Sequence, residues 1–198
     1  MKKLLYSVIT MMILGVTMVN AQNSRTSLTY AVGFGTGDLG DFISTPSWRG
    51  FNIEALKMVS EKVGVGGSFS WNVFYEAKDF DTYTLGTASL SGKQYRYSNN
   101  LPMSLNVNYY LTAGQKILPY VGLGTGIMYT RRNTDMNIYT IEQEAWQFLL
   151  QPQLGIEISN EYSSAFTIVA KYFYGFSAQD FDKAQSYISL NVGWTFKS

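Results

Sequence analysis

The sequence of 198 residues contains no cysteine and no histidine. Without cysteine it can form no disulfide and cannot carry a lipid-modified cysteine behind a signal sequence. Without histidine it has no Ser-His-Asp triad, no histidine general base and few ligands for a transition metal. We therefore expect no catalytic residues, no metal site, no cofactor and no enzyme activity.

Charge is also scarce. Charged residues make up 15% of the chain, against about 25% in a typical soluble protein. The net charge is only +1, so no basic field favours nucleic acid as a partner. Beyond the N-terminus, no apolar run is long enough for a transmembrane helix. A low content of charged residues, without an apolar run that could form a spanning helix, indicates either a protein whose β-strands contact lipid or a soluble protein rich in β-structure.

The N-terminus has the pattern of a targeting segment. Lys2 and Lys3 precede a mostly apolar run over residues 4–19, and Val19-Asn20-Ala21 is a small-x-small cleavage site. This pattern predicts a Sec signal peptide over 1–21 and a mature domain over 22–198. The alternative is an uncleaved membrane anchor, because the apolar run approaches the lower length limit of a spanning helix.

The rest of the chain alternates between apolar and small polar residues. In the last stretch Ile188, Leu190, Val192, Trp194 and Phe196 share one face, and the residues between them are small or polar. A period of two predicts β-strands with two different faces. Eight such stretches lie near 27–36, 50–59, 63–76, 95–111, 118–131, 139–158, 165–176 and 185–196.

The connections between these stretches alternate between short and longer ones. Those after the second, fourth and sixth are compact, whereas the other four are polar and mostly longer, near 37–49, 78–94, 132–138 and 177–184. This layout, with an even number of strands, is typical of an all-β, eight-stranded antiparallel up-and-down transmembrane β-barrel. Closure leaves no unpaired edge in lipid, and we expect both termini on the periplasmic side.

The polar face indicates which side is the lumen. It is rich in Gly, Ser, Asn and Gln and carries few charges, which suits a narrow lumen filled by side chains. Five charges share this face and are expected to form a paired network, because unpaired buried charges are costly: Glu54, Glu76, Arg96, Glu157 and Lys171. The alternative is a soluble, lipocalin-like periplasmic binding barrel, whose apolar face would lie inside.

Three residues fit this barrel poorly. Pro102 and Pro152 fall inside expected strands, and because proline cannot donate to a ladder we expect a bulge at each. Lys57 falls on the lipid-facing side near a turn, where its long side chain can reach the membrane surface.

The sequence resembles the small outer-membrane β-barrel family related to the transmembrane domains of OmpA and OmpX, and more loosely to OmpW. The signal peptide, the eight spans and the ending Asn191-Val192-Gly193-Trp194-Thr195-Phe196 carry this resemblance. It implies a Gram-negative outer membrane, with lipid, periplasmic chaperones and the barrel-assembly machinery as partners. Gly193, Trp194 and Phe196 would form the assembly signal, although Lys197 and Ser198 follow where many members end on the aromatic residue.

Three functions remain open for such a barrel, because one fold hosts unrelated activities. The first is a structural or surface-interaction barrel that presents 37–49 and 78–94 to an extracellular ligand. The second is a narrow channel or uptake route for a small or hydrophobic molecule, porin-like or OmpW-like. The third is the soluble lipocalin-like barrel. Eight strands and the bulky inward residues Phe74, Tyr110, Tyr120 and Phe173 favour a filled lumen and therefore the first function.

Overall fold

The computed structural model describes residues 23–85, 88–160, 163–178, 181 and 183–198, so the expected signal peptide over 1–21 lies outside the described residues. Among those residues, none of the helices is both long and apolar enough to span a membrane. One short helix, α2 (Gly37–Phe42), accompanies eight strands: β1 (Ser24–Thr36), β2 (Arg49–Met58), β3 (Val63–Leu85), β4 (Ala88–Tyr110), β5 (Ile117–Met136), β6 (Tyr139–Ser159), β7 (Ser164–Gly175) and β8 (Gln185–Lys197).

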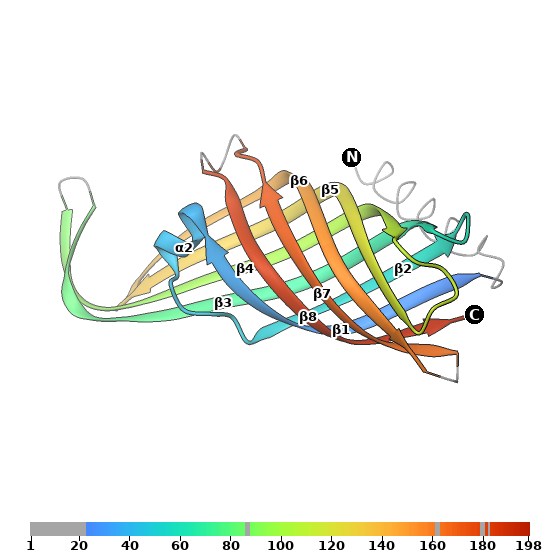
Figure 1. The fold of residues 1–198 in the computed structure, drawn as a ribbon. Coiled ribbons are helices and arrows are strands. Elements are labelled where there is room, and N and C mark those ends of the chain that lie inside the picture. Colours follow the sequence, from blue (N-terminus) through green and yellow to red (C-terminus); the bar gives the residue numbers. More distant parts are fainter. Residues whose placement is uncertain (1–22, 86–87, 161–162, 179–180, 182) are drawn as a thin grey trace.

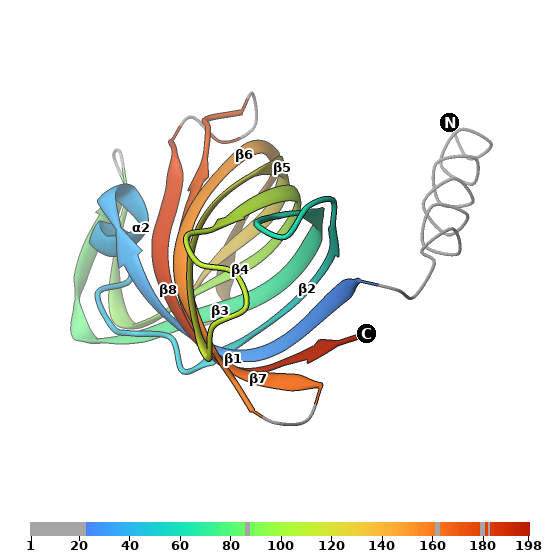
Figure 2. The same ribbon diagram turned by 45° about the vertical axis from the view of Figure 1, so that its right-hand side comes forward.

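The eight strands form a closed antiparallel ring in sequence order, as the sequence predicts. β1 pairs with β8 from Arg25↔Lys197 to Thr36↔Ser186, and this ladder closes the ring. Figure 2 shows the ring, and Figure 1 shows the C-terminus beside the start of β1 at one end of it. Because each strand has two neighbours within the ring, its backbone groups are hydrogen-bonded without help from solvent.

The two faces of the strands separate inside from outside. On β4, Leu105 points outward and is 73% exposed, whereas its neighbours Asn106 and Asn108 are fully buried in the lumen. The same alternation runs along β8, where Trp194 is exposed and Thr195 is buried. The apolar face is therefore the outer surface, as lipid requires. The lipocalin-like alternative is wrong, since it needs the apolar face inside.

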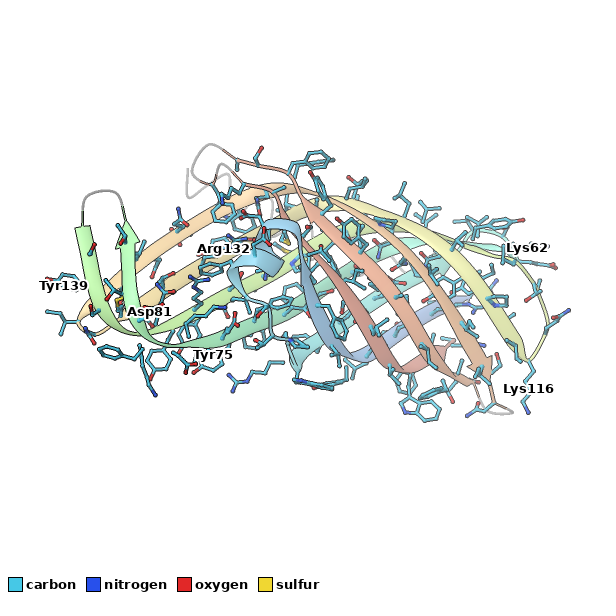
Figure 3. All side chains as sticks on the ribbon, turned by 60° about the vertical axis from the view of Figure 1, so that its left-hand side comes forward. Lys62, Tyr75, Asp81, Lys116, Arg132 and Tyr139 are labelled. Carbon is cyan, nitrogen blue, oxygen red and sulfur yellow. The ribbon has the colours of Figure 1, made fainter. Side chains whose placement is uncertain are left out.

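Four strands are far longer than the other four. β3 and β4 have 23 residues each, β5 has 20 and β6 has 21, whereas β1, β2, β7 and β8 have 10 to 13. The extra length projects beyond the ring as two hairpins, which we call the extended sheet (Figure 1). Figure 3 places Asp81 and Tyr139 in this sheet and Lys62 and Lys116 in short turns at the other end of the barrel.

Two segments that were expected to be loops belong to the extended sheet. β3 and β4 stay paired to Leu85↔Ala88, so most of 78–94 is strand. β5 and β6 stay paired to Met136↔Tyr139, so 132–138 is a strand end and a tight turn, with Asn137 in the left-handed region at φ 53°. These segments look like loops in the sequence because they are polar, but strands that leave the membrane need no apolar face.

The two prolines are accommodated differently from the expectation. The β3–β4 ladder keeps one register on both sides of Pro102, from Phe69↔Met103 to Asn72↔Asn100, and lacks only the pairs between. The β6–β7 ladder likewise keeps its register past Pro152. Each proline therefore removes local hydrogen bonds, but its strand contains no extra residue there. The expected bulges at these two positions are wrong.

Candidate functional site

A buried ion pair lies in the middle of the lumen. Lys171 Nζ on β7 is 2.8 Å from Glu54 Oε2 on β2, and the two residues are 1% and 3% exposed. Lys171 Nζ also donates to Asn52 Oδ1 at 3.1 Å. Burial makes an unpaired charge costly, so each of these groups depends on the other.

Side-chain amides complete the shell around Glu54. Asn106 Nδ2 and Asn108 Nδ2 on β4 each donate to one of its carboxylate oxygens at 2.9 Å, and Gln153 Nε2 on β6 donates at 3.3 Å. The carboxylate thus has the hydrogen-bond partners that a buried anion requires. The middle of the lumen is a packed polar core.

A second carboxylate, Glu157, lies toward the end of the barrel with the short turns. Arg25 Nη1 is 2.5 Å from its Oε2, and Tyr110 OH donates to its Oε1 at 2.7 Å. The Arg25 guanidinium lies 4.4 Å from the centre of the Tyr110 ring. Tyr110 also belongs to a buried apolar layer with Leu118, Tyr120 and Val169. This layer fills the lumen on the side of the polar core that is nearer the short turns.

Helix α2 fills the opposite mouth of the barrel. Leu39 and Ile43 are fully buried, and they pack in one cluster with five lumen residues, Phe74, Met128, Leu149, Phe173 and Tyr187. Within this cluster the rings of Phe173 and Tyr187 are stacked at 4.6 Å. Apolar layers therefore lie on both sides of the polar core.

Three charged side chains on neighbouring strands hold the segment around α2. Glu76 on β3 accepts from Ser44 N at 2.9 Å and Ser44 Oγ at 2.7 Å. Arg96 Nη1 on β4 donates to the Phe42 carbonyl at 2.9 Å. Arg132 Nη1 on β5 donates to Asp38 Oδ2 at 3.0 Å. We call Glu76, Arg96 and Arg132 the mouth latch; Figure 3 shows Arg132 beside α2.

Arg132 and Asp38 join α2 to the connection between β7 and β8. The Arg132 guanidinium lies 4.9 Å from the ring centre of Phe42 and 4.6 Å from that of Phe181. Lys183 Nζ is 2.8 Å from Asp38 Oδ1. Partial burial raises the pKa of Asp38, but the hydrogen bonds from Lys183 and Arg132 outweigh it, and the pKa lies below its ordinary value. The ionised carboxylate is thus the stable form in the latched mouth.

The five charges expected to form one network are divided among three places. Glu54 and Lys171 meet in the polar core, and Glu157 lies near the turn end. Glu76 and Arg96 lie at the mouth, opposite one another in the β3–β4 register. Among the described ion pairs Glu76 has Lys78 as its partner, at 2.9 Å, whereas Arg96 bonds to Gln94 and Phe42.

Sequence reasoning missed three members of these clusters, Arg25, Asp38 and Arg132. Arg132 was expected in a loop, yet Thr130 and Met128 are buried two and four residues earlier on the same strand face. Because side chains of a strand alternate between its two faces, Arg132 shares the inward face of Met128 and Thr130, and this pattern could have predicted its inward direction. No local signal connects Arg25 with Glu157, because 132 positions separate them.

The expected assembly signal lies on β8. Trp194 and Phe196 are exposed on the outer face, and the Trp194 ring meets Phe166 edge-on at 5.5 Å. Gly193 faces inward where β1 approaches closely, since a Cβ there would lie 2.1 Å from the Leu28 carbonyl oxygen. The barrel wall itself thus requires glycine at this position.

No family model matches the chain, and no curated protein matches it significantly. Solved structures do match. Neisserial surface protein A has a TM-score of 0.59 at 13% identity, over 89% of this chain and 98% of that one. OprG of Pseudomonas aeruginosa has 0.52 at 16%, over 90% and 97%. Ail of Yersinia pestis, in complex with the heparin analogue sucrose octasulfate, has 0.51 at 17%, over 87% and 97%.

These matches define the class of protein by its fold. The chain has the fold of the small, eight-stranded outer-membrane β-barrel proteins, and the resemblance expected from the sequence is confirmed at this level. At such low identity the likeness concerns the fold alone.

The polar core yields a stability prediction. Lys171→Met leaves Glu54 charged and unpaired, so we expect the free energy of unfolding to fall by about 3–5 kcal/mol. Adding Glu54→Gln removes that charge, and the double variant should be more stable than Lys171→Met alone. Urea titration in lipid vesicles measures this. The exposed Lys116→Met is the control, with a change within about 0.5 kcal/mol. Equal stability of Lys171→Met and the wild type would contradict the pairing.

The latch yields a prediction about pH. Because the folded pKa of Asp38 lies below the ordinary value of 3.8, its ionised form stabilises the latch fully above the unfolded pKa of about 3.9. That contribution is lost as pH falls through the lower folded pKa. A nitroxide on Asp41→Cys should therefore become more mobile, by electron paramagnetic resonance, below about pH 4. With Asp38→Asn added, the label should already be more mobile at pH 6, so its gain in mobility on acidification should be smaller; a label equally immobile in both proteins at pH 6 would contradict the role of Asp38.

Proposed function

We propose that this protein is a non-enzymatic, surface-interaction barrel of the bacterial outer membrane. The ring anchors the protein in lipid, and the extended sheet is the part that meets a partner. The observation that carries this proposal is the filling of the lumen: a polar core between two apolar layers occupies it, while four strands continue past the mouth.

A filled lumen argues against a channel. Eight strands enclose a space just wide enough for side chains, and only larger barrels leave a water-filled path. Here Leu39 and Ile43 fill one mouth, and Tyr110 and Tyr120 belong to the layer near the other. A channel or uptake route would require both layers to move.

The layout of the connections supports one orientation. Outer-membrane barrels have short periplasmic turns and longer extracellular elements. By this rule the extended sheet is extracellular, both termini are periplasmic, and the ending with Gly193, Trp194 and Phe196 is presented to the barrel-assembly machinery and its chaperones as the strand enters the membrane.

The extended sheet is a better ligand surface than the segment 37–49. Leu39 and Ile43 in that segment are buried in the mouth, and the latch holds it there. Phe80, within 78–94, is 70% exposed. A barrel of this fold can present a ligand site, as the complex of Ail with sucrose octasulfate shows for Ail.

Conductance tests the closed lumen. The purified full chain in planar bilayers should show no large, stable porin-like steps, because the layers of Tyr110 and Leu39 obstruct the lumen. A known porin in the same bilayers is the positive control. Steady steps would favour the channel, and their change in Lys171→Met would locate the current in the lumen.

Labelling of whole cells tests the orientation, and the native chain has no cysteine to interfere. A membrane-impermeant maleimide should label Ser91→Cys in the extended sheet and Ser177→Cys after β7. It should not label Asn160→Cys in a short turn until the outer membrane is permeabilised. Labelling of Asn160→Cys alone on intact cells would reverse the orientation.

A further inference from the structure

A cavity of about 500 Å³ lies at the end of the barrel with the short turns, and we call it the turn-end cavity. The start of β1, the turn after β2 and the turn after β4 line it, with Arg25, Glu61 and Ala113 among their residues. Met58, at the end of β2, also lines it and packs on its other side against the buried layer of Tyr110. The volume falls within the range of small-molecule sites, about 300–1,000 Å³.

Arg25 contributes to this cavity a guanidinium that is held from two sides. Its Nη1 lies 2.5 Å from Glu157 Oε2, and its centre lies 4.4 Å from the centre of the Tyr110 ring. Tyr110 OH in turn donates to the other oxygen of Glu157 at 2.7 Å. These contacts fix the plane of the guanidinium before any ligand arrives, and such preorganisation lowers the cost of binding.

One edge of that guanidinium is unused. Arginine has five N–H donors in a rigid planar group. In the part of the chain that the structure describes, Nη1 of Arg25 has Glu157 as its acceptor, whereas Nε and Nη2 have none. The Nε–H and one Nη2–H lie on the same edge and point the same way, as a fork that matches the two oxygens of a carboxylate or a phosphate.

The charges at this end of the lumen are unbalanced. Lys197 on β8 lies directly opposite Arg25 in the ladder that closes the ring. Both side chains point inward, because Thr195 and Ser27, two residues farther along each strand, are buried. Lys197 Nζ lies 4.0 Å from the same oxygen of Glu157 that Arg25 contacts. Like charges directly opposite one another are destabilising, and this one carboxylate leaves the inward side chains with one positive charge in excess.

We propose that the turn-end cavity binds a small organic carboxylate, with its carboxylate on the Nε–Nη2 edge of Arg25 and its apolar body against Met58 and Val59. A single negative charge balances the excess of Arg25 and Lys197 over Glu157, whereas a phosphate monoester, with a charge of about −1.5 to −2, exceeds it. The site lies at the opposite end of the barrel from the extended sheet and does not rest on the proposed function.

A glutamate in the lining restricts the ligand further. Glu61 is exposed to solvent, so water and salt screen its charge. Arg25 and Glu157 are largely buried, where charges interact more strongly. Arg25 therefore selects an anion, and Glu61 disfavours ligands that carry more than one negative charge.

Nuclear magnetic resonance of the full chain in uncharged detergent micelles tests the site, with hexanoate as the probe. The Nε–H signal of Arg25, identified by its loss in Arg25→Lys, should shift saturably, with a dissociation constant on the order of 1 mM for a ligand of this size. Hexanamide has the same apolar body without the charge and should shift the signal much less. The amide signal of Gly114 in the cavity wall reports binding in the variants.

Two variants separate the fork from the space. Arg25→Lys keeps a positive charge beside Glu157 but removes the planar fork, so hexanoate should bind about tenfold more weakly. Ala113→Trp leaves every charge in place and fills the cavity, so it should weaken binding by at least as much. Lys116→Met is the matched control, because Lys116 is an exposed cation in a turn at the same end (Figure 3) and lies outside the lining; its affinity should be unchanged. Heat-modifiable gel mobility verifies that each variant is folded.

The inference is overturned by the absence of a saturable shift at any soluble concentration of hexanoate, by equal shifts with hexanamide, or by unchanged affinity in either Arg25→Lys or Ala113→Trp. Tighter binding of inorganic phosphate than of hexanoate would assign the cavity to phosphate instead. Binding of hexylamine that Glu61→Gln abolishes would assign it to a cation. None of these results depends on conductance or on the labelling of the extended sheet, so failure here is distinguishable from failure of the proposed function.

Discussion

The structure depends on one constraint, which is that lipid offers no hydrogen bonds to a strand. Every backbone N–H and C=O inside the membrane must find a partner in a neighbouring strand, and a sheet meets this demand only by closing. The ladder between β1 and β8 performs the closure. Where the ring ends this demand also ends, and there β3, β4, β5 and β6 continue past it as the extended sheet.

Closure with eight strands has a second consequence, a lumen too narrow for anything but side chains. Inward residues must therefore fit one another closely across neighbouring strands. A Cβ at Gly122 would lie 2.1 Å from Asn108 Oδ1, and one at Gly124 would lie 2.3 Å from Asn106 Oδ1. Glycines on β5 thus make room for the asparagines of β4 that solvate Glu54. The polar core therefore depends on the glycines of β5.

The mouth latch shows how charge at the end of a barrel can serve a different purpose from charge in its middle. Glu54 and Lys171 neutralise each other within the core, whereas Glu76, Arg96 and Arg132 each reach across to the segment around α2. A helix of six residues has little stability of its own. Its position therefore depends on these contacts and on the burial of Leu39 and Ile43. The segment around α2 thus closes the mouth of the barrel, and the extended sheet is the part that projects beyond it.

The sequence by itself determined the strands, their faces and the inward direction of residues such as Glu54 and Lys171, because side-chain parity is a local property of a strand. The tertiary structure decided which inward groups meet. Arg25 reaches Glu157 only because ring closure brings β1 near β6 across the lumen. Glu76 and Arg96 are neighbours in register, yet the segment around α2 gives each another partner, Ser44 for Glu76 and the Phe42 carbonyl for Arg96. The strand character of 78–94 was also decided in three dimensions, since polar residues outside the membrane form a strand only when a second strand pairs with them.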